Sequence, residues 1–97
     1  MPEMSQFMTP RREVIFAGNV QGVGFRYTAA GIAADYAVAG FVRNLRDGRV
    51  QIVAEGQVEE IDRFLAALQV RMHRYIRTTT TSEQAPTGEF SGFEIRY

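Results

Sequence analysis

The chain has 97 residues, of which 45% are hydrophobic and 23% are charged, and its eleven basic side chains are balanced by eleven acidic ones. This composition predicts one globular domain with a single modest core, and the zero net charge argues against a general attraction to nucleic acid or to an anionic membrane. Cysteine is absent, which excludes disulfides and thiolate chemistry, and neither an export signal nor an apolar run of membrane-spanning length is visible, so we expect a cytoplasmic protein with no membrane partner.

The N-terminal segment shows no hydrophobic period. Residues 1–12 include two prolines, so we interpret them as a flexible extension and assign residues 13–97 to the domain. Residues 13–20 form a short apolar run, which predicts the first strand. This strand would lead the chain into a glycine-rich stretch.

The glycine-rich stretch spans residues 18–26 and reads Gly-Asn-Val-Gln-Gly-Val-Gly-Phe-Arg. Gly22 and Gly24 can adopt positive φ, which lets successive backbone N–H groups point into one concavity. A helix that opens near Arg26 would add the unpaired N–H groups of its first turn, and the forked guanidinium suits two phosphate oxygens. The stretch therefore predicts an anion site, although a tight loop with a surface arginine explains such a pattern about equally often.

The first helix is predicted to run to about residue 37. Its apolar residues recur at helical spacing and would form one buried stripe, comprising Phe25, Ala29, Ile32, Ala33 and Tyr36.

Segments 40–45 and 49–55 are strand-like and flank an Asp-Gly pair, which is a strong hairpin signal because the turn needs positive φ. If that pair alone forms the turn, Asn44 lies opposite Gln51. If the preceding arginine joins a three-residue loop, Asn44 lies opposite Val50. The sequence leaves both registers open.

The second half of the chain predicts one helix and two strands. Residues 58–68 combine an apolar stripe with an acidic polar face, residues 73–82 contain four consecutive threonines, and residues 93–97 alternate as a half-buried strand. The resulting order, β-α-β-β-α-β plus a C-terminal strand, predicts an α+β sandwich of the ferredoxin-like kind. It would have a mostly antiparallel sheet with two helices on one face.

Three segments resemble the acylphosphatase family. Residues 20–26 resemble its first signature, residues 40–44 (Gly-Phe-Val-Arg-Asn) followed by Asp-Gly resemble its second, and residues 93–97 resemble its C-terminal strand. The resemblance covers residues 13–97 and implies the same ferredoxin-like fold. It further implies a hydrolase that converts a small-molecule acyl phosphate to a carboxylate and inorganic phosphate, without a metal or other cofactor, and we expect a monomer.

The resemblance assigns Arg26 to the substrate phosphate and Asn44 to the attacking water, as the catalytic pair. It assigns phosphate binding to Gln21, Gly22, Val23, Gly24, Phe25 and Arg26. Neither arginine nor asparagine can act as a general base, so a phosphate oxygen of the substrate is the nearest plausible proton acceptor. No obvious acid near the loop could protonate a leaving group, which favours a carboxylate leaving group and hence a mixed anhydride over a phosphate ester.

Two other functions are compatible with this pattern. A non-catalytic module that binds phosphate or an acyl phosphate would need the same loop. A nucleic-acid-binding domain of the RRM kind would need exposed aromatics on the central strands and a basic surface, which the neutral composition does not favour.

Several residues have simpler interpretations. We expect Arg43 to be a surface or ion-pair residue and His73, the only histidine, to be an ordinary strand residue that holds no metal. Tyr75, Phe93 and Tyr97 are expected in the core or on a sheet face.

The chain departs from the family pattern at three places. Asn19 stands where a basic residue is common, and Phe41 stands where tryptophan is frequent. Residues 70–72 (Val-Arg-Met) replace a Gly-Pro after the second helix, which leaves the connection into the fourth strand open.

Overall fold

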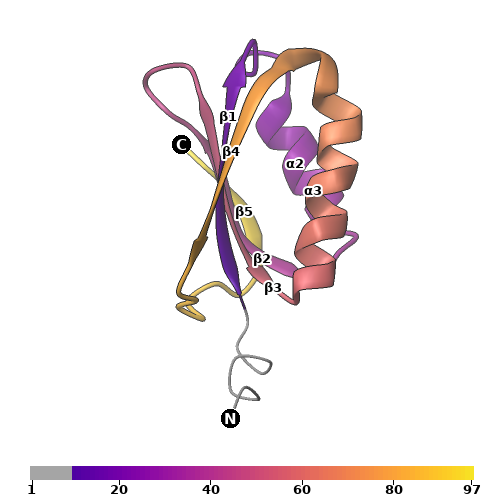
Figure 1. The fold of residues 1–97 in the computed structure, drawn as a ribbon, viewed down its shortest axis with the longest axis vertical. Coiled ribbons are helices and arrows are strands. Elements are labelled where there is room, and N and C mark those ends of the chain that lie inside the picture. Colours follow the sequence, from indigo (N-terminus) through magenta and orange to yellow (C-terminus); the bar gives the residue numbers. More distant parts are fainter. Residues whose placement is uncertain (1–9) are drawn as a thin grey trace.

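Five strands form one sheet, and two helices pack on one of its faces (Figure 1). A computed structural model describes residues 10–97. The elements in chain order are β1 (Arg11–Gly18), α2 (Phe25–Ala33), β2 (Val38–Asn44), β3 (Val50–Gly56), α3 (Val58–Met72), the short 3-10 helix η1 (His73–Tyr75), β4 (Ile76–Gln84) and β5 (Phe93–Arg96). The sheet order is β4-β1-β3-β2-β5, and every pair is antiparallel except β2 with β5. The predicted ferredoxin-like sandwich with an added C-terminal strand is confirmed.

The main core lies between the sheet and the two helices. Alternate residues of the central strands point toward the helices, and they meet one apolar stripe from each helix. The largest fully buried side chains of this core are Phe16, Phe64, Ile52, Ile61 and Leu68. Burial of each such side chain contributes about 1.5–3 kcal/mol relative to exposure. The core therefore fixes both the strand faces and the placement of α2 at the site described below.

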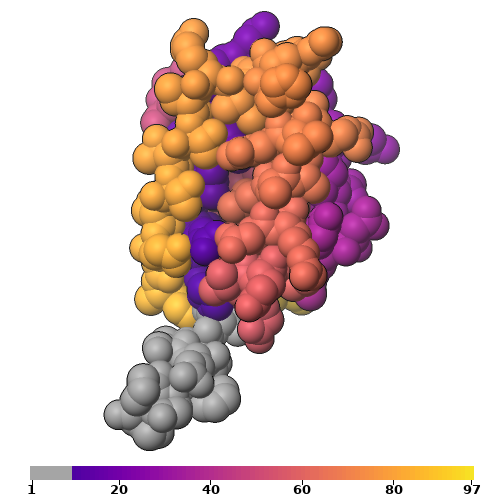
Figure 2. Space-filling view, turned by 45° about the vertical axis from the view of Figure 1, so that its right-hand side comes forward, coloured from indigo at the N-terminus to yellow at the C-terminus, as the bar shows by residue number. Residues whose placement is uncertain are grey.

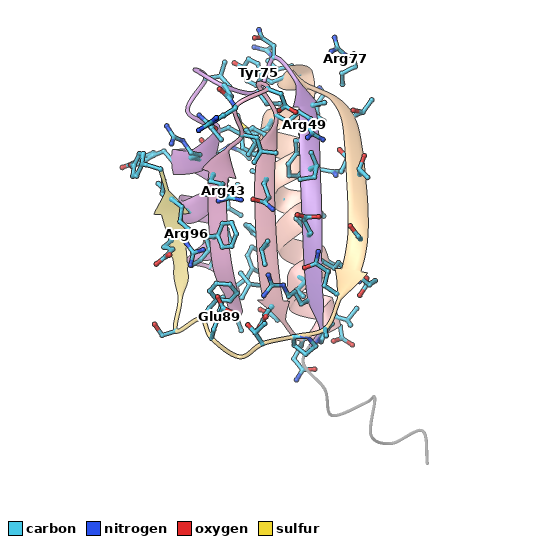
Figure 3. All side chains as sticks on the ribbon, turned by 90° about the vertical axis from the view of Figure 1, so that its left-hand side faces the viewer. Arg43, Arg49, Tyr75, Arg77, Glu89 and Arg96 are labelled. Carbon is cyan, nitrogen blue, oxygen red and sulfur yellow. The ribbon has the colours of Figure 1, made fainter. Side chains whose placement is uncertain are left out.

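The sheet face away from the helices, here called the open face, carries a smaller apolar layer. Phe41 of β2 is only 6% exposed, and its ring lies 5.9 Å from that of Phe90 in the β4–β5 connection. The guanidinium of Arg96 packs 4.1 Å from the centroid of the Phe41 ring, and Figure 3 shows Arg96 and Arg43 on this face. The central strands β1 and β3 present no aromatic side chain on the open face. This face lacks the stacking platform of an RRM.

Glu55, at the end of β3, holds the β4–β5 connection against the open face. Its carboxylate is 5% exposed and accepts hydrogen bonds from the backbone N–H groups of Thr87 (2.8 Å) and Gly88 (3.0 Å). Arg11 of β1 adds an ion pair at 3.2 Å. Three segments distant in sequence are thereby joined through one buried carboxylate.

The pH dependence of folding should report this carboxylate. Burial acts to raise the pKa of Glu55, but the N–H groups of Thr87 and Gly88, the Thr87 hydroxyl and Arg11 outweigh it, and they lower the pKa below its ordinary 4.5. The stabilisation is complete above that ordinary value and is lost as the pH falls through the lower pKa of the folded state. We expect Glu55→Gln to lower the free energy of unfolding by about 1–3 kcal/mol at pH 7.

Denaturant unfolding of both proteins at pH 7 and at about pH 3 measures this effect, and the difference between them should shrink at the lower pH. An equal difference at the two pH values would contradict the role of the ionised carboxylate.

β1 begins at Arg11, two residues before the predicted strand and inside the segment assigned to the extension. Arg11 and Arg12 pair in register with β3 and β4, and the side chain of Arg12 also binds Asp62 and Glu83. These contacts explain the earlier start. Residues 1–9 of the predicted extension lie outside the described residues.

α2 ends at Ala33, four residues before its predicted end. The N–H groups of Asp35 and Tyr36 bond to carbonyl oxygens three residues back, and the N–H of Ala37 is bound by the Glu60 carboxylate at 2.7 Å. The chain therefore tightens into turns against α3. Tyr36 still packs on the core beyond the end of the helix. The helical spacing of apolar residues in the sequence therefore extends further than the helix itself.

The connection into the fourth strand also differs from the prediction. α3 continues to Met72, η1 follows, and β4 begins only at Ile76. His73 is therefore not a strand residue; it is exposed in η1, where its Nδ1 lies 3.3 Å from the carbonyl oxygen of Val70. The other strand ends lie within one or two residues of their predicted positions. Between residues 10 and 97, no helix has the length and apolar character needed to cross a membrane.

Candidate active site

A pocket of about 170 Å³ opens where the glycine loop, the end of β2 and the end of β5 meet. It is lined by Val20, Gly22, Gly24, Phe25, Arg26, Tyr27, Asn44, Ile95 and Tyr97. The fold thus brings Arg26 and Asn44, the pair implied by the sequence resemblance, into one pocket together with both loop glycines.

The glycine loop has the backbone geometry expected of an anion site. Gly22 and Gly24 both have φ of 78°, and a Cβ at either position would meet nothing within 4 Å, so it is the backbone angle that requires glycine. Gly24 is the N-cap residue of α2, and no side chain among the described residues accepts a capping hydrogen bond from the N–H groups of the first turn. That turn also contains no acidic residue. The N–H groups of that turn have no partner within the helix and carry its positive end.

Other loop residues use their side chains to hold the loop in place. The amide of Gln21 donates to the backbone carbonyls of Leu45 (2.8 Å) and Arg49 (2.9 Å), which ties the loop to the β2–β3 hairpin. Phe25 is buried against Phe16, with ring centroids 5.1 Å apart. Gln21 and Phe25 are therefore left with their backbone N–H groups as donors to a ligand, and the same holds for Val23, which packs against the core.

The hairpin register decides where Asn44 points. Asn44 pairs with Val50, the register of the three-residue turn, and the hydrogen bond from Leu45 N–H to the Arg49 carbonyl closes that turn at 2.8 Å. Val50 is fully buried under the helices, so Asn44 shares the helix side of the sheet. Among the described residues, no hydrogen bond occupies the Asn44 side chain, which leaves its amide available inside the pocket.

Arg43 points to the opposite face of the sheet. Its Nε donates to Gln51 at 2.6 Å, and its side chain is exposed, as expected for a surface residue (Figure 3). The neighbouring residues Asn44 and Arg43 of β2 therefore lie on opposite faces of the sheet, Asn44 in the pocket and Arg43 on the surface.

Tyr97 is a pocket residue that the sequence interpretation missed. The residue as a whole is 96% exposed to solvent, yet the centroid of its ring lies 4.8 Å from the guanidinium carbon of Arg26. Arg26 forms no ion pair with any of residues 10–97, and its charged group lies over this ring. The alternation of Phe93, Ile95 and Tyr97 in the sequence indicated that these side chains share one face of the last strand. Only the parallel pairing of β5 with β2 brings that face next to the glycine loop.

The pocket has a polar half and an apolar half. Its polar half consists of the loop backbone, Arg26 and Asn44, and its other walls are the side chains of Val20, Tyr27, Ile95 and Tyr97. His73 and the arginines near it in sequence do not line this pocket. Within residues 10–97, no group of three or more histidine or acidic side chains is placed to hold a metal ion.

Comparison with known proteins identifies relatives over most of the chain. The family model described as Acylphosphatase matches residues 12–95. An acylphosphatase from Methylococcus capsulatus is 45% identical over 87 residues, covering 88% of this chain and 94% of that protein. An acylphosphatase from Archaeoglobus fulgidus is 36% identical over 85 residues, covering 88% and 96%.

Solved structures give the same result. The crystal structure of acylphosphatase from Bacillus subtilis has a TM-score of 0.81 at 31% identity, covering 91% of this chain and 99% of that one. The crystal structure of HypF from T. kodakarensis has a TM-score of 0.75 at 29% identity, and there the match covers 93% of this chain but only 12% of that one.

Proposed function

The chain belongs to the acylphosphatase family, and from that premise we propose that it hydrolyses the carboxyl-phosphate bond of acyl phosphates in the pocket between the glycine loop and Asn44. One observation supports this proposal above the others. The glycine loop, the Arg26 guanidinium and the Asn44 amide line one pocket that also has an apolar wall, and the Asn44 amide has no hydrogen-bond partner among the described residues.

The loop and Arg26 would bind the phosphoryl group. Backbone N–H groups of residues 21–25 and of the first turn of α2 supply fixed donors, and the guanidinium supplies two more in a planar fork. Phosphoryl transfer proceeds largely by positioning and by stabilising charge on the equatorial oxygens. These donors need no rearrangement during the reaction, which is the condition under which they lower the barrier most.

Asn44 would orient the attacking water. Its amide oxygen can accept a hydrogen bond from the water while its NH₂ group donates to a phosphate oxygen. The water oxygen forms a bond to phosphorus, the bond between phosphorus and the acyl oxygen breaks, and its electron pair leaves on the carboxylate. The proton lost by the water passes to a phosphate oxygen, because neither Arg26 nor Asn44 can accept it.

The apolar half of the pocket would receive the acyl group. Ile95 and the two tyrosine rings form its surface next to the phosphate donors, and no acidic side chain of the described residues lines the pocket. An aromatic or aliphatic acyl chain would be favoured there over a charged one, because apolar contact is gained without desolvating an ion.

Tyr97 acts in this proposal as a positioning residue for Arg26. A guanidinium over an exposed aromatic ring is stabilised by about 0.5–1 kcal/mol, so we expect Tyr97→Ala to weaken inorganic phosphate binding and raise KM about two- to fivefold. Tyr97→Phe keeps the ring and should behave as the parent protein. Phosphate titration and initial-rate kinetics on the three proteins measure this. Equal loss in both variants would assign the effect to the hydroxyl and contradict the role of the ring.

The activity is tested by hydrolysis of benzoyl phosphate by protein dialysed against a chelator. We expect rapid release of phosphate and little hydrolysis of an aryl phosphate ester, since no histidine or carboxylic acid side chain of the described residues lines the pocket to protonate an alkoxide or phenoxide leaving group. Loop amide signals that respond to phosphate without any turnover would instead assign the chain to the class of non-catalytic acyl-phosphate-binding modules.

A further inference from the structure

The two edges of the sheet differ in how well they are protected. β5 forms one edge and has only four residues, two of them charged. β4 forms the other edge and has nine residues, and its stretch from Thr78 to Ser82 carries no charge, proline or glycine. Proteins usually shorten, charge or bend an edge strand, because its free N–H and C=O groups invite another strand. The middle of β4 has none of these protections.

The free edge of β4 is regular over most of its length. β4 pairs with β1 without interruption from Gln84 to Thr78, and the register shifts only beyond that point, between Ala17 and Gly18. No described element lies outside β4, as Figure 3 shows at the margin of the sheet, and Figure 2 shows β4 in orange along one border of the folded part. Every β4 side chain except that of Ile76 is exposed.

We propose that β4 is the contact surface for a second copy of this chain, with the two β4 strands antiparallel and the two-fold axis at Thr80. In this register Thr80 of one copy faces Thr80 of the other copy, and Thr79 of each copy faces Thr81 of the other. Cross-strand threonine pairs are favourable in antiparallel sheets. The two five-stranded sheets would join into one continuous sheet, and the isologous contact closes on itself without further growth.

Charge complementarity selects this register and this occupant. With the axis at Thr80, Arg77 of one copy lies opposite Glu83 of the other, and the symmetry repeats the pair at the far end of the contact. With the axis at Thr79, Arg77 would face Thr81 and Glu83 would face Tyr75. With the axis at Thr81, Glu83 would face Thr79 and Arg77 would face Ala85, so neither shifted register pairs the two charges. Among residues 10–97, Arg77 has no ion pair or side-chain hydrogen bond, and Glu83 uses only its Oε2 atom, toward Arg12. The second carboxylate oxygen is available to the other copy.

The proposed dimer leaves the candidate active site open. The opposite edge of the sheet carries Asn44 at the end of β2, Ile95 on β5 and Tyr97 just beyond the end of β5. The inference therefore does not depend on the reaction proposed above, and it replaces the expectation of a monomer.

Sedimentation equilibrium of the full chain over a wide concentration range tests the proposal. The wild type should approach twice its monomer mass of 10.9 kDa as concentration rises. Thr80→Lys and Thr80→Glu each place like charges face to face on the axis, so each should raise the dimer dissociation constant about tenfold or more. An equimolar mixture of these two variants should dimerise again, because opposite charges then face each other.

Ala66→Lys, at an exposed position on α3, is the matched control and should dimerise as the wild type does. All variants should keep the far-ultraviolet circular dichroism spectrum of the parent, which shows that they fold. A wild type that keeps its monomer mass at millimolar concentration would overturn the proposal. A dimer that Thr80→Lys leaves intact, or a mixture that fails to recover, would overturn this interface.

Discussion

Arg26→Ala is expected to lower kcat/KM for benzoyl phosphate by about 10³-fold or more, the largest effect of any single side chain in this protein. Among residues 10–97, Arg26 is the only cationic side chain that lines the pocket, and in the proposed mechanism its guanidinium would contact the phosphoryl group both before the reaction and in the transition state. Both KM and kcat should therefore change, and the affinity for inorganic phosphate should fall with them. Steady-state kinetics and a phosphate titration measure the two effects separately.

Two further variants make the Arg26 result specific. Arg26→Lys keeps the charge but loses the planar fork, so its activity should lie between those of the parent and Arg26→Ala. Arg63→Ala removes an exposed guanidinium from α3, which pairs only with Glu60 among residues 10–97, and should leave the kinetics unchanged. Parent-like phosphate affinity in Arg26→Ala would contradict the assignment of Arg26 to the phosphoryl group.

Asn44→Ala is expected to lower kcat by about 10²-fold or more while phosphate affinity changes less than about threefold. In the proposed mechanism the asparagine side chain would position the water and contribute little to binding, because the loop and Arg26 would provide most donors to the phosphate. Single-turnover rates and phosphate binding on the same protein separate these contributions. Asn19→Ala is the matched control, since Asn19 is the other asparagine of the chain and is exposed outside the pocket. A rate within about threefold of the parent for Asn44→Ala would remove it from the mechanism.

The anion loop could be predicted from the sequence because its requirements are local. Positive φ at Gly22 and Gly24 and a helix start beside Arg26 depend on a few neighbouring residues, and the structure has all three. The order and type of the elements also followed from hydrophobic period and turn residues.

The register of the hairpin could not be predicted in the same way. Turns of two and of three residues both satisfy an Asp-Gly signal, and they differ by one residue in the pairing of Asn44. The buried position of Val50 decides between them, and that burial is a property of the assembled core.

Contacts between distant segments account for the remaining differences. Tyr97 reaches Arg26 only after β5 pairs with β2, and Glu55 is satisfied only when residues 87 and 88 fold back over the open face. The same holds for the early end of α2, where the carboxylate of Glu60 binds the N–H of Ala37. No local pattern encodes a partner that lies on another element.

The parallel pairing of β5 with β2 has a consequence for the order of folding. Every other part of the pocket lies on elements from the first half of the chain, but its last wall is delivered by the strand farthest from them in sequence. Closing so long a loop is slow compared with forming a helix or a hairpin. A refolding chain would recover its helical circular dichroism and its β2–β3 hairpin before it recovers phosphate affinity. A nascent chain would have the complete pocket only after β5 had emerged and docked on β2.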